Sequence, residues 1–178
     1  MSDASAPAAA EPAAAPQDPT VHGCPVTDSR GQQVIHPTRE QYVSVAKALL
    51  ADGYETCSDL TAVDYLHVAQ RSVAPGIAAE RFEIVVNLLS MATRQRIRLR
   101  VQVPADDPSV ATLFDLYPGT EAMEREVYDM FGIRFDNHPD LRRILTWEEF
   151  PAHPLRKDYP VKGRGERENY KVISRTDA

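Results

Sequence analysis

The stretch RFEIVVNLLSMATRQRIRLRVQV, residues 81–103, decides the fold expected for this chain. Its first part, residues 81–91, is an apolar run rich in β-branched side chains, which is typical of a buried strand. After a short polar turn at residues 92–95, residues 96–103 alternate strictly between Arg or Gln and an aliphatic side chain. This alternation predicts a half-buried antiparallel strand that forms a hairpin with the first. We interpret the arginines of the second strand as the solvated face of the sheet, and the alternative is a docking surface.

Upstream of the hairpin, the sequence predicts one helix and one further strand. Thr38 and Gln41 have the spacing of a capping box, an amphipathic run follows them, and Gly53 ends it. Residues 60–68 (LTAVDYLHV) then predict a strand.

Downstream of the hairpin, the sequence predicts two more helices. Residues 107–116 begin with Asp-Pro, which favours a helix start, and Thr120 caps a further helix that ends at Gly132. We expect Glu124 and Asp129 on the side of this last helix that faces away from the core. Its expected core stripe is Met123, Val127, Met130 and Phe131.

This order of elements predicts an α+β fold, with a small mixed or antiparallel sheet packed with helices over residues 23–137. Residues 1–22 are rich in Ala and Pro and lack an apolar period, so we expect a disordered extension there. Residues 138–178 keep neither the helical nor the strand period over a useful length. We expect them to form a long extended C-terminal arm, called the arm below.

The arm combines chain-breaking prolines with a high density of aromatic and charged residues. Ordering its backbone costs on the order of 1–2 kcal/mol per residue, and its few apolar side chains cannot offset this by packing on one another. Disordered tails, however, rarely carry Trp, Phe and Tyr so densely. We therefore predict an interaction arm that takes its shape from other proteins.

Composition narrows the possible partners and compartment. The formal net charge of −6 gives no reason to expect nucleic acid or anionic lipid as the main partner. Two cysteines, Cys24 and Cys57, are too few for a disulfide scaffold, a four-thiolate cluster or a structural zinc site, and they fit a reducing compartment. Because no run reaches the roughly 18–20 apolar residues that cross a bilayer, we expect membrane association only through a partner.

We predict no catalytic residue, no cofactor-binding residue and no metal ligand in this chain. It has no nucleophile elbow, no G-x-G-x-x-G and no P-loop. One alternative from another class is a small metal-dependent hydrolase built on His138, His153 and Asp158, although their spacing matches no zinc pattern.

Arginines near the start of the arm offer a way to hold it against the domain. Glu124 and Glu126 point in different directions from one helix, so they do not form a catalytic acid and base pair. We expect them to pair instead with Arg142 or Arg143 through charge-assisted hydrogen bonds.

Several ordered blocks of the chain resemble one known family. The blocks are DLTAVDY (59–65), RFE (81–83), PADDP (104–108), ERE (124–126), DMFGI (129–133), HPDLRRIL (138–145) and HPLRKDYP (153–160). They resemble the C subunit of the bacterial proton-pumping NADH:quinone oxidoreductase, respiratory complex I. The chain departs from the family pattern at Ala122, where Trp is usual, and at Ala152, where Gly is usual.

The resemblance implies a non-catalytic subunit of the peripheral arm of complex I, at the module where electrons pass to quinone. FMN, the iron–sulfur clusters, NADH and quinone would be bound by other subunits. The implied partners are the D subunit, which resembles a hydrogenase large subunit, and the cluster-bearing B and I subunits. The implied location is peripheral, on the cytoplasmic side of the cell membrane. The alternative within this architecture is a homologous subunit of a membrane-bound hydrogenase or of another donor-specific quinone dehydrogenase.

The candidate interface residues are the charged, His and Tyr side chains of the helix and arm blocks. They are Glu124, Arg125, Glu126, Asp129, His138, Arg142, Arg143, His153, Arg156, Lys157, Asp158 and Tyr159.

Overall fold

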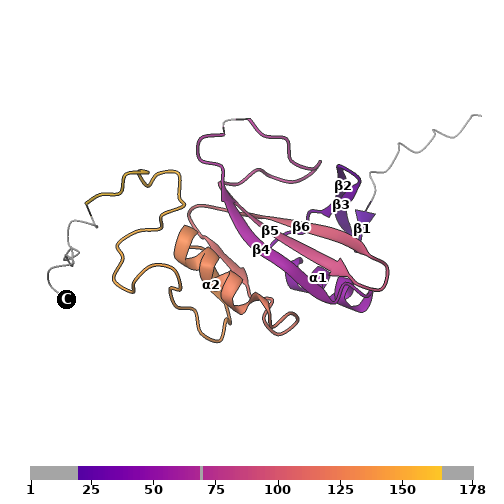
Figure 1. The fold of residues 1–178 in the computed structure, drawn as a ribbon. Coiled ribbons are helices and arrows are strands. Elements are labelled where there is room, and N and C mark those ends of the chain that lie inside the picture. The colour runs from indigo at the N-terminus through magenta and orange to yellow at the C-terminus, as the bar shows by residue number, and fades with distance from the viewer. Residues whose placement is uncertain (1–19, 69, 166–178) are drawn as a thin grey trace, which may run out of the picture.

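The computed structural model describes residues 20–68 and 70–165, and it has an α+β fold built on a six-stranded mixed sheet (Figure 1). Residues 1–19 and 166–178, which include most of the expected extension and the end of the expected arm, lie outside the described residues. The strands are β1 Thr20–Val21, β2 Cys24–Ser29, β3 Gln32–Ile35, β4 Thr56–Asp64, β5 Phe82–Ser90, β6 Gln95–Val103, β7 Ser109–Ala111 and β8 Arg134–Asp136. The helices are α1 Tyr42–Ala51 and α2 Thr120–Phe131.

The predicted hairpin forms the centre of the sheet, whose strand order is β1-β2-β3-β6-β5-β4. β5 and β6 pair antiparallel over their whole length, with Val86 opposite Leu99. The other side of β6 pairs in parallel with β3, and this parallel step makes the sheet mixed. The α+β class and the hairpin are therefore confirmed.

Both helices pack on the same face of the sheet, as Figure 1 shows. Leu49 of α1 and Val127 of α2 belong to one buried cluster with the inward-facing side chains of β5 and β6. On β6 those side chains are Ile97, Leu99, Val101 and Val103, and the intervening positions face the opposite side.

The helix boundaries follow the predicted signals closely. Thr38 and Gln41 do exchange hydrogen bonds, at 3.3 and 3.1 Å, but they close the turn that precedes α1. Thr120 is the first residue of α2 and not its cap as predicted, because the N-cap is Gly119; Gly132 ends the helix as predicted, in the left-handed conformation with φ 71°. Among the described residues, neither helix is long and apolar enough to span a membrane.

Two predictions of secondary structure were wrong. The helix expected at residues 107–116 is replaced by β7, which pairs in parallel with β8. Val110 and Thr112 are β-branched and both are buried, and a strand partner distant in sequence decides the conformation in a way that a local pattern does not reveal. The strand expected at residues 60–68 begins earlier, and β4 ends at Asp64.

The described part of the arm, residues 138–165, contains no helix or strand, as expected. It lies beside α2 and leaves the domain at the opposite end of the molecule from β1 (Figure 1). Contacts with the domain were expected only at Arg142 or Arg143, but the structure shows them from His138 to Asp158. The contacts that hold it are described next.

Candidate functional site

Asp129, near the end of α2, fixes the first part of the arm. Its buried Oδ2 atom accepts hydrogen bonds from the backbone N–H groups of Ile144, Leu145 and Thr146, at 3.0, 2.7 and 2.8 Å. Its Oδ1 atom accepts a hydrogen bond from Nη1 of Arg143 at 2.7 Å. Burial alone would raise the pKa of Asp129, but the donors from Thr146, Arg143 and Leu145 outweigh it and hold the pKa well below its usual range. The carboxylate therefore stays ionised and ties the arm to the helix.

The carbonyl groups at the C-terminal end of α2 also find partners in the arm. The last four carbonyl groups of a helix have no partner within it. Three arm groups contact three successive carbonyl oxygens: His153 Nδ1 on Asp129, Leu155 N–H on Met130 and Arg156 Nε on Phe131, at 2.9, 3.1 and 2.5 Å. Arg156 also brings positive charge to the negative end of the helix dipole. The arm thus caps α2.

Gly132 makes this close approach possible. It adopts φ 71°, a conformation that side chains rarely tolerate. A Cβ atom there would lie 2.5 Å from Nε2 of His153 and 2.7 Å from Nη2 of Arg156. A side chain at this position would therefore displace the side chains of His153 and Arg156 from the end of α2.

A second buried carboxylate, Asp64 at the end of β4, holds the far part of the arm. Nε and Nη2 of Arg81 donate to its two oxygens at 3.1 and 2.9 Å, and the N–H group of Lys157 donates at 2.8 Å. Nη2 of Arg81 also donates to Asp158 at 2.9 Å, so the arginine bridges the sheet and the arm. Burial would raise the pKa of Asp64, but the bonds from Arg81, Lys157 and Leu66 lower it.

Glu124 lies in the core, contrary to the prediction that it faces outward and pairs with an arginine. Its carboxylate accepts hydrogen bonds from the hydroxyl group of Thr112 at 2.5 Å and from the N–H group of Leu113 at 2.8 Å. Nε2 of His138 lies 3.9 Å from the same carboxylate, and both side chains are fully buried. Burial raises the pKa of Glu124, although these neighbours oppose the effect. The buried contact between Glu124 and His138 therefore fixes the first residue of the arm against the core of the domain.

The arginines have other partners than predicted. Arg143 pairs with Asp129, whereas Arg142 pairs with the adjacent Asp140 at 2.7 Å on the surface. Arg125 reaches the same segment and donates to the carbonyl oxygens of Arg142 and Arg143 at 3.1 and 3.2 Å. Glu126 is exposed on α2.

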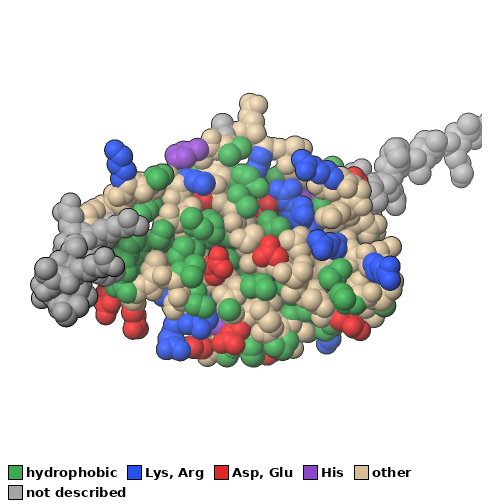
Figure 2. All heavy atoms as spheres, viewed as in Figure 1, with side chains coloured by type: hydrophobic (Ala, Val, Ile, Leu, Met, Phe, Trp, Pro, Cys, Tyr) green, Lys and Arg blue, Asp and Glu red, His purple; other side chains and the backbone are tan. Residues whose placement is uncertain are grey.

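An apolar groove with a volume of about 1070 Å³ is lined by the arm and by His67. Its lining includes Trp147 and Phe150, whose rings pack edge to face with centroids 4.6 Å apart, and Tyr159. Two of the interface candidates, Arg156 and Lys157, also line it. Green apolar side chains gather over this end of the molecule in Figure 2.

Exposed large apolar side chains among the described residues are unevenly placed. Five of eight belong to the arm: Ile144, Leu145, Trp147, Leu155 and Val161. Leu66 and Val68 adjoin it, because Nε2 of the intervening His67 lies 3.1 Å from the carbonyl oxygen of Lys157. Met91, 67% exposed, stands alone on the hairpin turn. Concentrated exposed apolar surface is typical of a protein interface.

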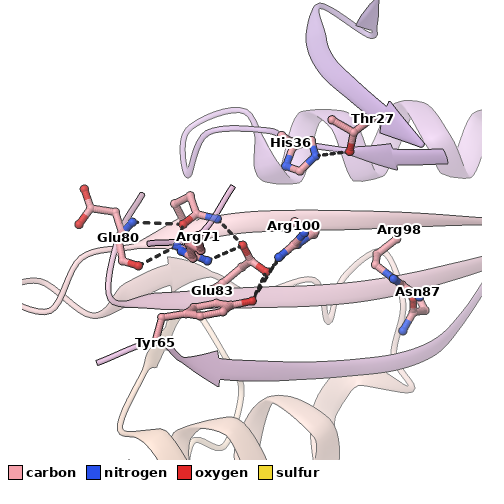
Figure 3. Close-up of polar contacts among 10 residues, drawn as sticks. Thr27, His36, Tyr65, Arg71, Glu80, Glu83, Asn87, Arg98 and Arg100 are labelled. Atoms are coloured by element: carbon pink, nitrogen blue, oxygen red, sulfur yellow. Dashed lines mark hydrogen bonds and ion pairs between the residues drawn. The ribbon is translucent and has the colours of Figure 1, made fainter. Parts of the chain in front are cut away.

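A separate polar cluster lies on the sheet face opposite the helices (Figure 3). Glu83 of β5 is 1% exposed and accepts bonds from Arg71 at 3.0 Å and from Arg100 at 2.6 Å. Tyr65 and Gln102 donate further hydrogen bonds to it, and the guanidinium group of Arg71 stacks 3.8 Å from the ring centroid of Tyr65. The expectation of a wholly solvated arginine stripe is therefore wrong at Arg100. The cluster fastens the segment after β4 to the sheet.

The residues of the metal-hydrolase alternative do not come together. His138 contacts the carbonyl oxygen of Glu121 at 3.2 Å, His153 contacts that of Asp129, and Asp158 pairs with Arg81. Within residues 20–68 and 70–165, no group of three or more His, Cys, Asp or Glu side chains is placed to hold a metal ion.

The sequence prediction missed several residues that organise the arm. Asp64, Arg81 and Gly132 were assigned only to elements or family blocks. One signal was present for Asp64: an acidic residue within an otherwise apolar strand needs a buried partner. Nothing local indicates that the partner lies in the arm.

Comparison with known proteins identifies the family. The family model "Respiratory-chain NADH dehydrogenase, 30 Kd subunit" matches residues 35–165. The chain belongs to this family. The C subunit of NADH-quinone oxidoreductase from Geobacter sulfurreducens is 42% identical over 147 residues, which cover 82% of this chain and 85% of the relative. The resemblance to the C subunit of complex I is thus confirmed, and the match supports it over the hydrogenase alternative.

Two solved structures extend the comparison of this member of the 30 Kd family. A structure described as Nqo5 of the trypsin-resistant fragment (1–134) is 34% identical with a TM-score of 0.60, and the match covers 67% of this chain and 90% of that one. The membrane-bound sulfane sulfur reductase, an archaeal respiratory membrane complex, includes a chain 21% identical with a TM-score of 0.67, and the match covers 87% of each. At that identity, the second likeness shows the fold alone.

Proposed function

We propose that this chain is a structural subunit of the peripheral arm of respiratory complex I. It supports the quinone-reducing connecting module, so that electron transfer from NADH to quinone is coupled to proton translocation. The observation that carries the proposal is the family match over residues 35–165, which includes most of the domain and most of the arm.

In this proposal the chain has no active site, and other subunits bind FMN, the iron–sulfur clusters, NADH and quinone. Its buried acidic groups support this division of labour, because their bonds serve the fold. Asp64 and Asp129 hold the arm, Glu124 holds the loop before α2, and Glu83 holds the segment after β4.

We propose that the arm surface contacts the hydrogenase-like D subunit and the neighbouring B and I subunits, and that this assembly keeps the chain peripheral on the cytoplasmic side of the cell membrane. The exposed apolar side chains of the arm support this assignment, because apolar anchors dominate stable interfaces. Interface candidates that are exposed, such as Glu126, Arg142 and Lys157, would touch partners directly. Buried candidates such as Asp129 would position the arm.

We retain the proposed division into an extension at residues 1–22, an α+β domain at 23–137 and an interaction arm at 138–178. The structure describes a short strand, β1 Thr20–Val21, at the boundary of the first two parts.

Affinity purification of the tagged chain from its native host tests the proposal. We expect mass spectrometry to find the other complex I subunits, and we expect NADH:quinone oxidoreductase activity in the purified assembly. Recovery of the chain without those subunits would contradict the proposal.

A matched pair of variants tests the arm surface. Leu145→Asp and Met91→Asp each place a charge at a similarly exposed apolar site, 63% and 67% exposed, but only Leu145 lies on the arm. We expect Leu145→Asp to lose the partner subunits while Met91→Asp retains them. Equal recovery of partners with both variants would refute the arm as the interface.

A further inference from the structure

The sheet face opposite the helices has two parts that differ in how their arginines are neutralised. At one part the buried carboxylate of Glu83 pairs with Arg100 of β6 and with the segment that follows β4. Towards the start of β6 the same face presents Arg98, which is half-buried, and Arg96, which is exposed. Figure 3 shows Arg98 apart from the Glu83 cluster. This second part of the face is called the Arg98 surface below.

The guanidinium group of Arg98 is held in place but not neutralised. Its Nε donates to Oδ1 of Asn87 at 2.8 Å and its Nη2 to Oε1 of Gln32 at 3.4 Å, and both acceptors are uncharged amides. The nearby acid Asp59 accepts a hydrogen bond from the other end of the Asn87 amide, at 3.5 Å. Among the described residues Arg98 forms no ion pair. A guanidinium group has five N–H donors, and these two bonds leave three for another acceptor.

The chemistry of this group selects a carboxylate as its ligand. A cation that is partly removed from water is stabilised by an anion, and a carboxylate can accept two parallel N–H bonds from one guanidinium group. The amides of Asn87 and Gln32 come from two other strands and already orient the side chain. A carboxylate therefore binds without the full entropic cost of ordering a free arginine.

The spacing along β6 adds a second contact. Side chains two residues apart on a strand share one face and lie about 6.6 Å apart along it. Arg96 and Arg98 have this spacing, and an extended ligand has the same repeat, so acids two residues apart in the ligand reach both arginines. On the neighbouring strand Leu89 is half-buried and pairs with Arg96, so it adds apolar contact area.

We propose that the Arg98 surface is a second protein interface, which binds an extended segment of a neighbouring complex I subunit with Asp or Glu at two positions two residues apart. One carboxylate binds the remaining N–H groups of Arg98, and the other pairs with Arg96. The inference rests on the proposed function, because the occupant belongs to the assembly. It adds a contact on the side of the sheet opposite the helices, whereas the arm lies beside α2 (Figure 1).

Zero-length coupling in the purified assembly tests this contact. A carbodiimide joins an amine to a carboxylate that touches it and does not join arginine, so Arg96→Lys supplies a reactive amine while it keeps the positive charge. We expect mass spectrometry to find an amide between position 96 and an Asp or Glu of another subunit, with a second acid two residues away. The native chain should lack this product. Absence of the product from the Arg96→Lys assembly, or coupling only to carboxylates of this chain, would overturn the inference.

Charge reversal at two exposed cations supplies the matched control. Arg96→Glu and Lys47→Glu change the charge equally, but Lys47 lies on α1, on the other side of the sheet. We expect Arg96→Glu to lower recovery of the coupled subunit several-fold, whereas Lys47→Glu should match the native chain. Equal recovery with the two variants would overturn the second interface and leave the proposed function intact. A native chain that recovers no complex I subunit would overturn both, so the two failures are distinguishable.

Discussion

The α+β domain and the arm are stabilised by different forces. The domain buries one continuous apolar cluster between the sheet and the two helices. In the described part of the arm only Phe150 is a buried apolar side chain, and the segment is held by polar bonds to Asp129, Asp64 and the carbonyl end of α2. A segment without a core of its own can thus keep a defined path by satisfying polar groups that the domain leaves unpaired. The comparison implies that single polar changes should release the arm without unfolding the domain.

The largest effect is expected from a change in the core of the domain. Leu99 in β6 is fully buried at the centre of the sheet. Leu99→Ala should lower the free energy of unfolding by roughly 2–5 kcal/mol, because it removes apolar contacts and leaves a cavity. Urea unfolding followed by circular dichroism measures this loss. The arm variant Leu145→Ala, at a 63% exposed site, should change the free energy of unfolding by less than about 0.5 kcal/mol. A similar loss of stability in the two variants would contradict the proposed difference between the domain and the arm.

A smaller and local effect is expected at Asp129. Asp129→Ala removes the acceptor for three backbone N–H groups and for Arg143, at a cost of about 1–3 kcal/mol. Hydrogen exchange should become fast over residues 144–146 while the strands of the domain stay protected. The control Asp140→Ala loses only an exposed pair with Arg142 and should keep the arm protected. Global loss of protection in Asp129→Ala would show that this carboxylate serves the domain core instead.

The sequence predicted the domain much better than the arm. The hairpin of β5 and β6 and the end of α2 at Gly132 depend on local periods and on a glycine, which a single sequence displays. The path of the arm depends on pairs distant in sequence, such as Asp129 with Thr146 and Asp64 with Lys157.

The expectation that the arm takes its shape only from other proteins was wrong for its described part, for the same reason. That expectation considered only the apolar side chains of the arm as a source of stability. It omitted the donors that the arm offers to the carboxylates and helix carbonyls of the domain. The burial of Asp129 could not be predicted for the same reason. The N–H groups that make burial of its carboxylate possible belong to the arm, which is distant in sequence.

Substitution of Gly132 separates backbone strain from displacement of the arm. Gly132 and Gly53 have φ values of 71° and 90°, which lie in the left-handed region. Alanine at either site should therefore lower the free energy of unfolding by roughly 1–2 kcal/mol through backbone strain. Only at Gly132 does the new Cβ meet the arm, because the nearest atom at Gly53 lies 3.9 Å away. Gly132→Ala should therefore raise the rate of tryptic cleavage within the arm, whereas Gly53→Ala should not. Equal cleavage rates would mean that the arm does not pack against the end of α2.

Acid should release the arm through a smaller, pH-dependent effect. The pKa values of Asp64 and Asp129 are lowered in the folded chain, so their contribution is fully present above the usual carboxyl value of 3.8 and is lost as pH falls below it. The emission of Trp147 should therefore change on acidification before the circular dichroism of the domain does. In Asp129→Asn the acid-dependent step should be reduced. An identical acid transition in that variant would assign the effect to other groups.

Hydrogen exchange of the isolated full-length chain addresses the origin of the arm's shape most directly. If the domain positions the arm, the backbone amides of Leu145, Thr146, Leu155 and Lys157 should be protected in the absence of any partner protein. Exchange of these four amides at the rate of an unstructured peptide, with protection appearing only after assembly, would contradict the account.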